Sequence, residues 1–337
     1  MTARPGPRNL LTDVPGLRVG QAEDARVRTG VTVIIPDAPA IAAVDVRGGG
    51  PGTRETDLLA PDTLVERVDA VVLSGGSVYG LAAADGVVAA LGAQGRGFTF
   101  RSTDVAAPIV PGAILFDLAN GGDKGWGEQP PYVALGRAAL ATADERFALG
   151  TAGAGYGATA GALHGGVGSA SIETEDGWTV GALAVVNSFG SVVAPGGRAF
   201  WAGAHEIGEE FGGLGPPVSR VASDDWGFAK REALARANTT LAVVATDVAL
   251  TSAEARRVAV MAQTGLARAI RPIHTHFDGD VVFALSTTRR SLPDPTPWSL
   301  TRLGALAADA LARAVARAVF EAEGWPESGT RRWRDLS

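Results

Sequence analysis

Short runs of apolar residues recur along the chain, and most of them are bounded by Gly, Pro or Asp. The runs are rich in Val, Ile and Ala, which is typical of strands buried in a sheet. We therefore expect strands at Val31–Pro36, Ile41–Val46, Ala70–Ser74, Ile114–Leu118, Ala182–Val186, Leu241–Thr246 and Val281–Thr287.

Longer segments between these runs place apolar residues at helical spacing. Before one of them, Thr251 and Glu254 form a capping-box pattern, which marks the start of a helix. The predicted helices are Val78–Leu91, Tyr132–Ala143, Ala253–Ala269 and Leu300–Glu323. This mixture of strands and helices predicts an α/β or α+β fold.

Two segments follow neither pattern. Gly48–Thr56 is a glycine-rich loop, and Ala194–Ala237 mixes Gly, Pro, aromatic and charged residues without a period. A surface loop as long as the second is uncommon in a compact domain and is usually either functional or mobile. We expect part of Ala194–Ala237 to be mobile.

Composition narrows the possible functions. The chain has 337 residues, 46% of them hydrophobic, and a net charge of −6, which allows one large domain or two modest ones. It has no Cys, which excludes thiol catalysis and disulfides. There is no basic stripe, so nucleic acid is not an expected partner. No apolar run is long enough for a membrane span, and Met1–Thr12 lacks the apolar part of a secretion signal. We therefore expect a cytoplasmic protein with no membrane partner.

Asn238 and Thr239 stand where the long irregular segment meets a predicted strand. Self-splitting hydrolases place their scissile bond at such a junction. The threonine hydroxyl attacks the preceding carbonyl, and an acyl shift followed by hydrolysis releases an N-terminal threonine. Its new α-amino group has a pKa of about 7.7–8.0 and takes the hydroxyl proton near neutral pH. Taken alone, an Asn-Thr pair fits a turn or a strand edge equally well.

Two histidines and two aspartates alternate in the segment His274-Thr-His276-Phe-Asp278-Gly-Asp280. In an extended chain these four side chains would share one face. One interpretation is a carboxylate pair that orients a hydroxyl nucleophile and relays protons. A second is a metal site, and a third is a polar loop with a turn at Asp-Gly.

The metal interpretation predicts a metal-dependent hydrolase that uses His274, His276 and Asp278. A catalytic site needs at least three ligands, and binuclear sites usually need further histidines. Only His164 and His205 remain elsewhere in the chain. Carboxylates could still complete the ligand set, so the metal-dependent hydrolase stays an alternative, but we expect neither a metal nor a cofactor.

Three further segments are candidates for a substrate cleft. Leu73–Gly80, which contains Tyr79, joins a predicted strand to a helix, and its glycines allow tight packing or a shaped pocket. Gly153–Gly161, which contains Tyr156, is rich in small residues. Asn187 ends an apolar run, where its amide is either a donor to an oxyanion or a turn residue.

Together these segments resemble a self-processing aminopeptidase/amidase family. The family includes the DmpA-type L-aminopeptidase/D-esterases, the β-peptidyl aminopeptidases and the nylon-oligomer endo-hydrolases. The resemblance extends from Leu11 to the last predicted helix. Its carriers are Val46-Arg-Gly-Gly-Gly50, Leu73-Ser-Gly-Gly-Ser-Val-Tyr-Gly80, Gly153-Ala-Gly-Tyr-Gly157, Val186-Asn187, Asn238-Thr239-Thr240 and Ile270-Arg-Pro-Ile-His-Thr-His-Phe-Asp-Gly-Asp280.

The resemblance implies a four-layer αββα sandwich like that of the N-terminal-nucleophile hydrolases. It also implies a single domain over residues 1–337 that cuts itself at Asn238–Thr239. The large chain would be 1–238 and the small chain 239–337, and both would stay associated in a homotetramer.

The resemblance also assigns roles to residues. Thr239 is the implied nucleophile, Asp278 and Asp280 match the acidic pair that contacts it, and Asn187 matches the amide that serves the oxyanion. A threonine with two aspartates is closer to the nylon-oligomer branch than to the serine-using aminopeptidases.

One position departs from the family pattern. Relatives of the threonine type carry a lysine near the nucleophile where this chain has Ala162, and its only lysines are Lys124 and Lys230. Loss of this lysine would slow processing or turnover, or leave activation of the hydroxyl to the α-amine of Thr239. The alternatives are that another cation, such as an arginine, replaces it or that the protein is an inactive homologue.

The implied substrate is a small peptide or an amide oligomer, cleaved through an acyl-enzyme. Tyr79, Phe116 and Tyr156 are the expected substrate contacts, although some relatives have a tyrosine in place of Phe116. We expect an aminopeptidase/amidase, with an endo-acting hydrolase of 6-aminohexanoate oligomers as the alternative on the same site.

Overall fold

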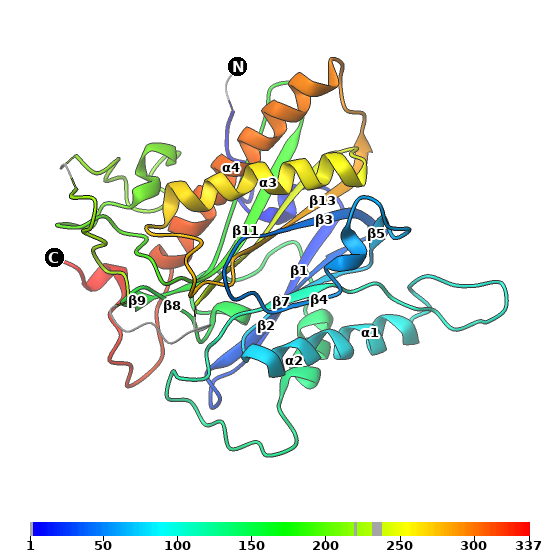
Figure 1. Ribbon diagram of the computed structural model, residues 1–337, viewed down its shortest axis with the longest axis horizontal. Coiled ribbons are helices and arrows are strands. Elements are labelled where there is room, and N and C mark those ends of the chain that lie inside the picture. Colours follow the sequence, from blue (N-terminus) through cyan, green and yellow to red (C-terminus); the bar gives the residue numbers. More distant parts are fainter. Residues whose placement is uncertain (1–2, 219–220, 231–237) are drawn as a thin grey trace.

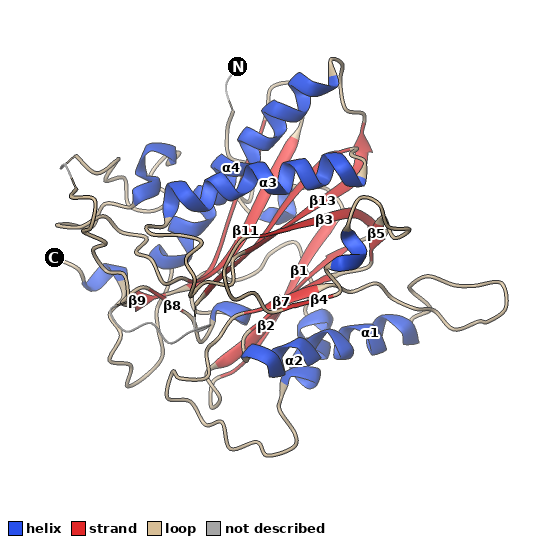
Figure 2. Ribbon diagram, viewed as in Figure 1, coloured by secondary structure: helices blue, strands red, loops and turns tan. Residues whose placement is uncertain are grey.

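Two β-sheets lie face to face, and helices cover both outer faces (Figure 1). The computed structural model describes residues 3–218, 221–230 and 238–337. Helices α3 (Ser252–Ala269) and α4 (Thr296–Phe320) pack on one sheet, and α1 (Ala83–Ala93) and α2 (Tyr132–Ala141) pack on the other (Figure 2). The layers confirm the expected αββα sandwich.

The larger sheet has six strands in the order β10-β11-β12-β13-β3-β5. β12 and β13 run parallel at its centre, and the other neighbours are antiparallel. Its strands are β3 (Ala40–Val46), β5 (Arg67–Val68), β10 (Gly166–Glu173), β11 (Thr179–Asn187), β12 (Thr239–Val248) and β13 (Val281–Arg290).

The smaller sheet has five strands in the order β1-β2-β6-β7-β4, with β6 and β7 parallel. Its strands are β1 (Leu17–Asp24), β2 (Thr29–Pro36), β4 (Thr53–Arg54), β6 (Val71–Ser74) and β7 (Gly112–Ile114). β8 (Thr159–Ala160) and β9 (Leu163–His164) form a separate hairpin. Short 3-10 helices occur at Leu11–Asp13, Asp57–Leu59, Ser77–Ala82, Gly153–Gly155, Trp201–His205 and Trp333–Asp335.

The apolar core follows these layers. One cluster of buried side chains fills the space between the sheets, and the other two lie between each sheet and its helices. β11 and β12 are buried along their whole length. Strands covered on both faces are apolar throughout and do not alternate, which explains why their sequences were recognisable as continuous apolar runs.

Helix α4 lies unusually close to β10, and Gly168 makes this possible. A β-carbon at Gly168 would lie 1.9 Å from the carbonyl oxygen of Ala314 and 2.4 Å from the amide nitrogen of Ala318. Any larger side chain would therefore force the helix away from the sheet.

The structure agrees with most of the expected elements and corrects others. The capping box of α3 is confirmed, because Thr251 Oγ1 accepts from the Glu254 amide and a Glu254 carboxylate oxygen accepts from the Thr251 amide. The strand expected at Ile114–Leu118 is wrong in its bounds, because β7 ends at Ile114. β1 and β10 were not predicted, since their Gly, Ser and charged residues conceal them.

The segment Ala194–Ala237 is less of a surface loop than its sequence indicates. Phe200 and Phe211 are almost fully buried, and the ring of Phe200 stacks on Trp333 at 5.3 Å between centroids. The expectation of mobility also covers positions 219–220 and 231–237, which lie outside the described residues. Within the described ranges, no helix has the length and apolar character of a membrane span.

Candidate active site

Thr239 begins β12 at the centre of the larger sheet. It lies opposite Asn187, the last residue of β11, and is only 3% exposed. The sheet therefore brings together two predicted site residues that are 52 positions apart in the sequence. A hydroxyl in this position is largely shielded from bulk water.

The carbonyl group of Asn238 is held by two donors. Its oxygen accepts a hydrogen bond from the Gly279 amide at 2.9 Å and one from Thr239 Oγ1 at 2.5 Å. A β-carbon on Gly279 would lie 2.7 Å from Thr239 Oγ1. A glycine is therefore needed for the backbone to approach both the carbonyl and the hydroxyl.

Asp280 fixes the start of β12. Its Oδ1 accepts from the Thr240 amide at 2.8 Å, and its Oδ2 accepts from the amide of His274 at 3.1 Å and lies 2.9 Å from Nδ1 of the same residue. The Asp280 side chain is fully buried. These bonds join the strand that carries Thr239 to the preceding loop.

Asp278 is also fully buried, and its carboxylate is surrounded by donors. Oδ1 accepts from the Phe189 amide at 3.1 Å, and Oδ2 accepts from the amide and the hydroxyl of Thr275 at 2.9 and 2.6 Å. Burial, and to a smaller extent the charge of Asp280, raise the pKa of Asp278, although these hydrogen bonds oppose the rise. The two aspartates thus lie in one site, as the carboxylate-pair interpretation predicts.

The same loop contradicts the metal interpretation. His274 has a φ of +56°, so the segment turns instead of continuing as an extended strand, and His276 is exposed. The four alternating side chains do not share one face. In the described part of the chain, no three His, Asp or Glu side chains are placed to hold a metal ion.

Lys230 supplies a cation that the sequence did not reveal. Its Nζ donates to Asn238 Oδ1 at 2.7 Å. Burial lowers the pKa of Lys230 to about 7, and the negative charge of Asp278 opposes this shift. Two residues before the lysine, the Phe228 carbonyl accepts from the Ala162 amide at 2.7 Å. Ala162, where the family resemblance implies a lysine, thus packs beside the segment that contains Lys230.

Asn187 is held rigidly at the end of β11. Its Oδ1 accepts from the Thr159 amide at 2.9 Å, and its Nδ2 donates to the carbonyl of Phe116 at 3.0 Å. These bonds connect the sheet to two loops that border the site. Its contribution to an oxyanion remains a prediction.

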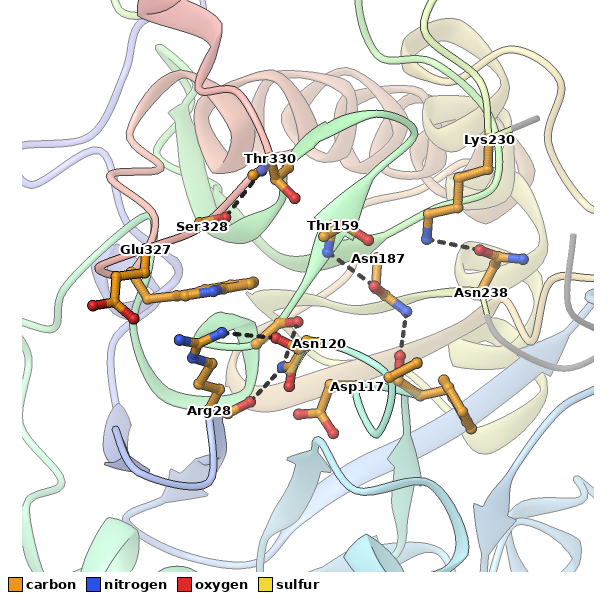
Figure 3. A pocket seen from close by; sticks show the side chains of 15 residues that line it. Arg28, Asp117, Asn120, Thr159, Asn187, Lys230, Asn238, Glu327, Ser328 and Thr330 are labelled. Atoms are coloured by element: carbon orange, nitrogen blue, oxygen red, sulfur yellow. Dashed lines mark hydrogen bonds between the residues drawn. The ribbon is translucent and has the colours of Figure 1, made fainter. Parts of the chain in front are cut away.

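A cavity of about 420 Å³ opens beside these residues (Figure 3). Lys230, Asn187 and Asn238 line one part of it, and Phe116 also contributes. The other lining residues are Arg28, Asp117, Ala119, Asn120, Gly157, Thr159, Trp325, Glu327, Ser328, Gly329 and Thr330. Ten of these fifteen residues have polar or charged side chains, which suits a substrate with hydrogen-bonding groups.

The two predicted tyrosine contacts lie elsewhere. Tyr79 is 47% exposed and packs edge-on against Trp126, and neither it nor Tyr156 is among the described residues that line this cavity. Of the three predicted substrate contacts, only Phe116 lines the cavity.

Comparison with known proteins identifies the family. A model of peptidase family S58 matches residues 9–332. An uncharacterized aminopeptidase of Mycobacterium tuberculosis is 45% identical over 97% of this chain and 98% of its own length. The chain belongs to peptidase family S58. A 6-aminohexanoate-oligomer endohydrolase of a Kocuria strain is 31% identical over 93% of this chain and 86% of its own length.

A solved structure has a similar fold. It is an L-aminopeptidase D-Ala-esterase/amidase from Ochrobactrum anthropi, described as a new variant among the Ntn hydrolase fold. Its TM-score is 0.70 at 22% identity, with 98% of this chain and 91% of that chain covered. As an S58 peptidase, the protein is a hydrolase of peptide or other linear amide bonds.

Sequence reasoning missed two features of this S58 site. The Gly279 amide is a backbone donor, and only the flanking aspartates pointed to it. Lys230 lies in an irregular segment without periodicity, so no pattern indicated which way its side chain points. The signal available for Lys230 was its rarity, because it is one of two lysines in the chain.

Proposed function

We propose that this S58 peptidase cuts itself between Asn238 and Thr239 and then uses Thr239 as the N-terminal nucleophile of an amide hydrolase. The observation that carries the proposal is the arrangement of the Asn238 carbonyl. The Thr239 hydroxyl lies against it, and the Gly279 amide donates to its oxygen.

In the self-cleavage step, Thr239 Oγ1 bonds to the carbonyl carbon of Asn238. The bond to the Thr239 nitrogen then breaks, and this nitrogen gains the hydroxyl proton. Water hydrolyses the resulting ester and leaves a carboxylate on Asn238. The Gly279 N–H is placed to stabilise the oxyanion, and a single donor of this kind contributes about 10²–10³ in rate.

In the processed enzyme the α-amine of Thr239 takes the hydroxyl proton as Oγ1 attacks a substrate carbonyl. The proton then passes to the leaving amine, and water releases the acyl group. Asp280 holds the start of β12 in place by accepting a hydrogen bond from the Thr240 amide. We assign Asp278 to orientation and proton relay around the nucleophile, and Asn187 to the oxyanion.

Cleavage would divide the single domain into chains 1–238 and 239–337. We propose that they stay associated, because β12 of the small chain pairs along its length with β11 of the large chain. From the family resemblance, we also propose that the protein assembles into a homotetramer. From its composition, we propose a cytoplasmic location.

The proposed substrates are small peptides and amides with a free N-terminal residue. The relative at 45% identity is named an aminopeptidase, and the polar cavity beside Asn238 fits a short substrate. The alternative is endo-cleavage of 6-aminohexanoate oligomers, the reaction named for the relative at 31% identity.

Two substrates separate these possibilities. We expect the processed protein to hydrolyse amino-acid p-nitroanilides and to leave an N-capped amide oligomer uncut, with no turnover of either by Thr239→Ala. Faster cleavage of the capped oligomer would favour the endo-hydrolase. Undiminished activity of Thr239→Ala would refute the threonine mechanism.

A further inference from the structure

The side chain of Asn238 occupies a specific polar position in the uncut chain. Asn238 is 1% exposed, and its Oδ1 accepts from Lys230 Nζ at 2.7 Å. Both residues line the cavity together with Asn187 and Thr159, and Figure 3 shows the lysine and the asparagine pointing toward each other. The amino group of a lysine thus donates to the side chain of the residue that precedes the proposed cut.

This contact bears on substrates, provided that the proposed function holds. In self-cleavage, Oγ1 of Thr239 forms an ester with the acyl group of Asn238. In turnover the same oxygen forms the same ester with the acyl residue of a substrate, and the Gly279 amide faces the same carbonyl. The substrate residue therefore takes the place of Asn238, and its side chain takes the place beside Lys230.

Lys230 stays in position after the cut because its attachments lie upstream of the cleaved bond. The Lys230 amide donates to the Phe189 carbonyl at 3.0 Å, and the Phe189 amide donates to Asp278 Oδ1 at 3.1 Å. Two residues earlier, the Phe228 carbonyl accepts from the Ala162 amide. Cleavage frees the asparagine and leaves the lysine facing the vacated space.

We propose that Lys230 selects substrates whose acyl residue has an oxygen acceptor on a short side chain, namely asparaginyl and aspartyl amides and peptides. An acceptor at the position of Asn238 Oδ1 restores the hydrogen bond of the uncut chain. An apolar side chain of similar size leaves the partly buried ammonium without that acceptor. Sites built to hydrogen-bond a substrate group discriminate strongly against analogues that lack the group.

The first test compares three substrates on the self-cleaved protein: Asn-, Asp- and Leu-p-nitroanilide. We expect wild-type kcat/KM to be about tenfold or more higher for the first two than for the third, as for a hydrogen bond to a charged group. Lys230→Met should lose this preference, so that its kcat/KM values for Asn- and Asp-p-nitroanilide fall to about the value that the same variant shows for Leu-p-nitroanilide. Lys230→Arg, which keeps the charge and the donor, should retain it.

A second measurement uses the uncut chain and does not need a lysine variant. With Lys230 in place, we expect Asn238→Asp to cleave within about threefold of the wild-type rate, and Asn238→Leu to cleave about tenfold or more slowly. This comparison decides the matter even if Lys230→Met fails to process.

Two results would overturn the inference while leaving the threonine mechanism intact. One is a wild-type protein that cleaves itself but hydrolyses the three anilides at similar kcat/KM. The other is an Asn238→Leu chain that cleaves as fast as the wild type. A chain that stays intact would remove the proposed function and this inference together.

Discussion

Gly279 lacks a β-carbon where its backbone lies against both the Asn238 carbonyl and the Thr239 hydroxyl. The glycine amide donates to the Asn238 carbonyl, and its α-carbon lies beside the threonine hydroxyl. The adjacent Gly50 carbonyl would also lie 2.9 Å from an added β-carbon. The backbone at Gly279 therefore approaches its neighbours more closely than a residue with a β-carbon could.

We expect Gly279→Ala to slow self-cleavage about a hundredfold, because the methyl group displaces Thr239 Oγ1 from the carbonyl that it attacks. The rate can be followed on denaturing gels. Gly197→Ala is the matched control, since a β-carbon there meets no atom within 4 Å. Equal rates for the two variants would show that the close approach of Gly279 is unimportant.

Asp117 is a titratable residue that lines the cavity. Burial raises the pKa of Asp117 to about 6, although hydrogen bonds from Thr29 Oγ1 and the Gly76 amide oppose the shift. Because the folded pKa lies above the unfolded value of 3.8, the folded protein binds more protons between these values. The stabilisation is thus complete below about pH 4 and is lost as the pH rises through about 6.

This difference between the folded and unfolded pKa of Asp117 corresponds to about 3 kcal/mol of unfolding free energy. We expect the free energy of unfolding of the wild type to fall by about that amount more than that of Asp117→Asn between pH 4 and pH 7. Urea titrations at both pH values measure it. Parallel pH profiles for the two proteins would contradict the raised pKa.

The residue scale also shows what the sequence could predict about the site. Thr239, Asn187, Asp278 and Asp280 were predicted from a resemblance, and the structure brings all four together. They lie close together because β11, β12 and β13 are neighbours in the sheet, and the order of strands in a sheet cannot be read from a single sequence. Lys230 lies in an irregular segment. The path of such a segment leaves no periodic pattern in the sequence, so its contacts could not be predicted.

At the scale of elements, the strands with long apolar runs were predictable, and those with small or polar residues were not. β10 contains Gly166, Gly168, Ser169 and Ser171 and lies at the edge of its sheet. β1 is an edge strand as well, and five of its eight residues are at least partly exposed. Whether such segments form strands depends on the elements that pack against them, and this cannot be read from the local sequence.

The packing of α4 on β10 provides a test at this scale. We expect Gly168→Ala to lower the free energy of unfolding by about 2 kcal/mol or more, because the methyl group overlaps the backbone of Ala314 and Ala318. Thermal and urea unfolding measure the change. A variant as stable as the wild type would mean that the helix does not approach the sheet this closely.

At the scale of the whole molecule, the proposed fragments are interleaved. β12 and β13 of residues 239–337 lie within the larger sheet, between β11 and β3 of residues 1–238. The fragments therefore share one sheet and the apolar clusters on both of its faces. Separating them after a cut would expose these clusters, so we expect the processed chains to remain together.

A buried ion pair also crosses the proposed cut. Arg313 is fully buried and donates from Nε to Glu210 at 2.5 Å and from another nitrogen at 2.8 Å. We expect Arg313→Met to cost about 3–5 kcal/mol of unfolding free energy, because Glu210 would be left buried without its partner.

The control is Arg302→Met, which breaks a more exposed pair with Asp176. Loss of such a pair costs about 0–1 kcal/mol. Urea unfolding of both variants makes the comparison. Similar losses for Arg313→Met and Arg302→Met would mean that the crossing pair does not hold the two fragments together.

The central claim is that Thr239 cuts the chain before itself, and intact-mass measurement of the purified protein tests it most directly. We expect the 34.3 kDa chain to be replaced over time by fragments of about 24 and 10 kDa, the smaller one beginning at Thr239. Thr239→Ala should remain a single chain under the same conditions. A wild-type chain that stays intact after long incubation, or a Thr239→Ala chain cut at the same bond, would contradict the account.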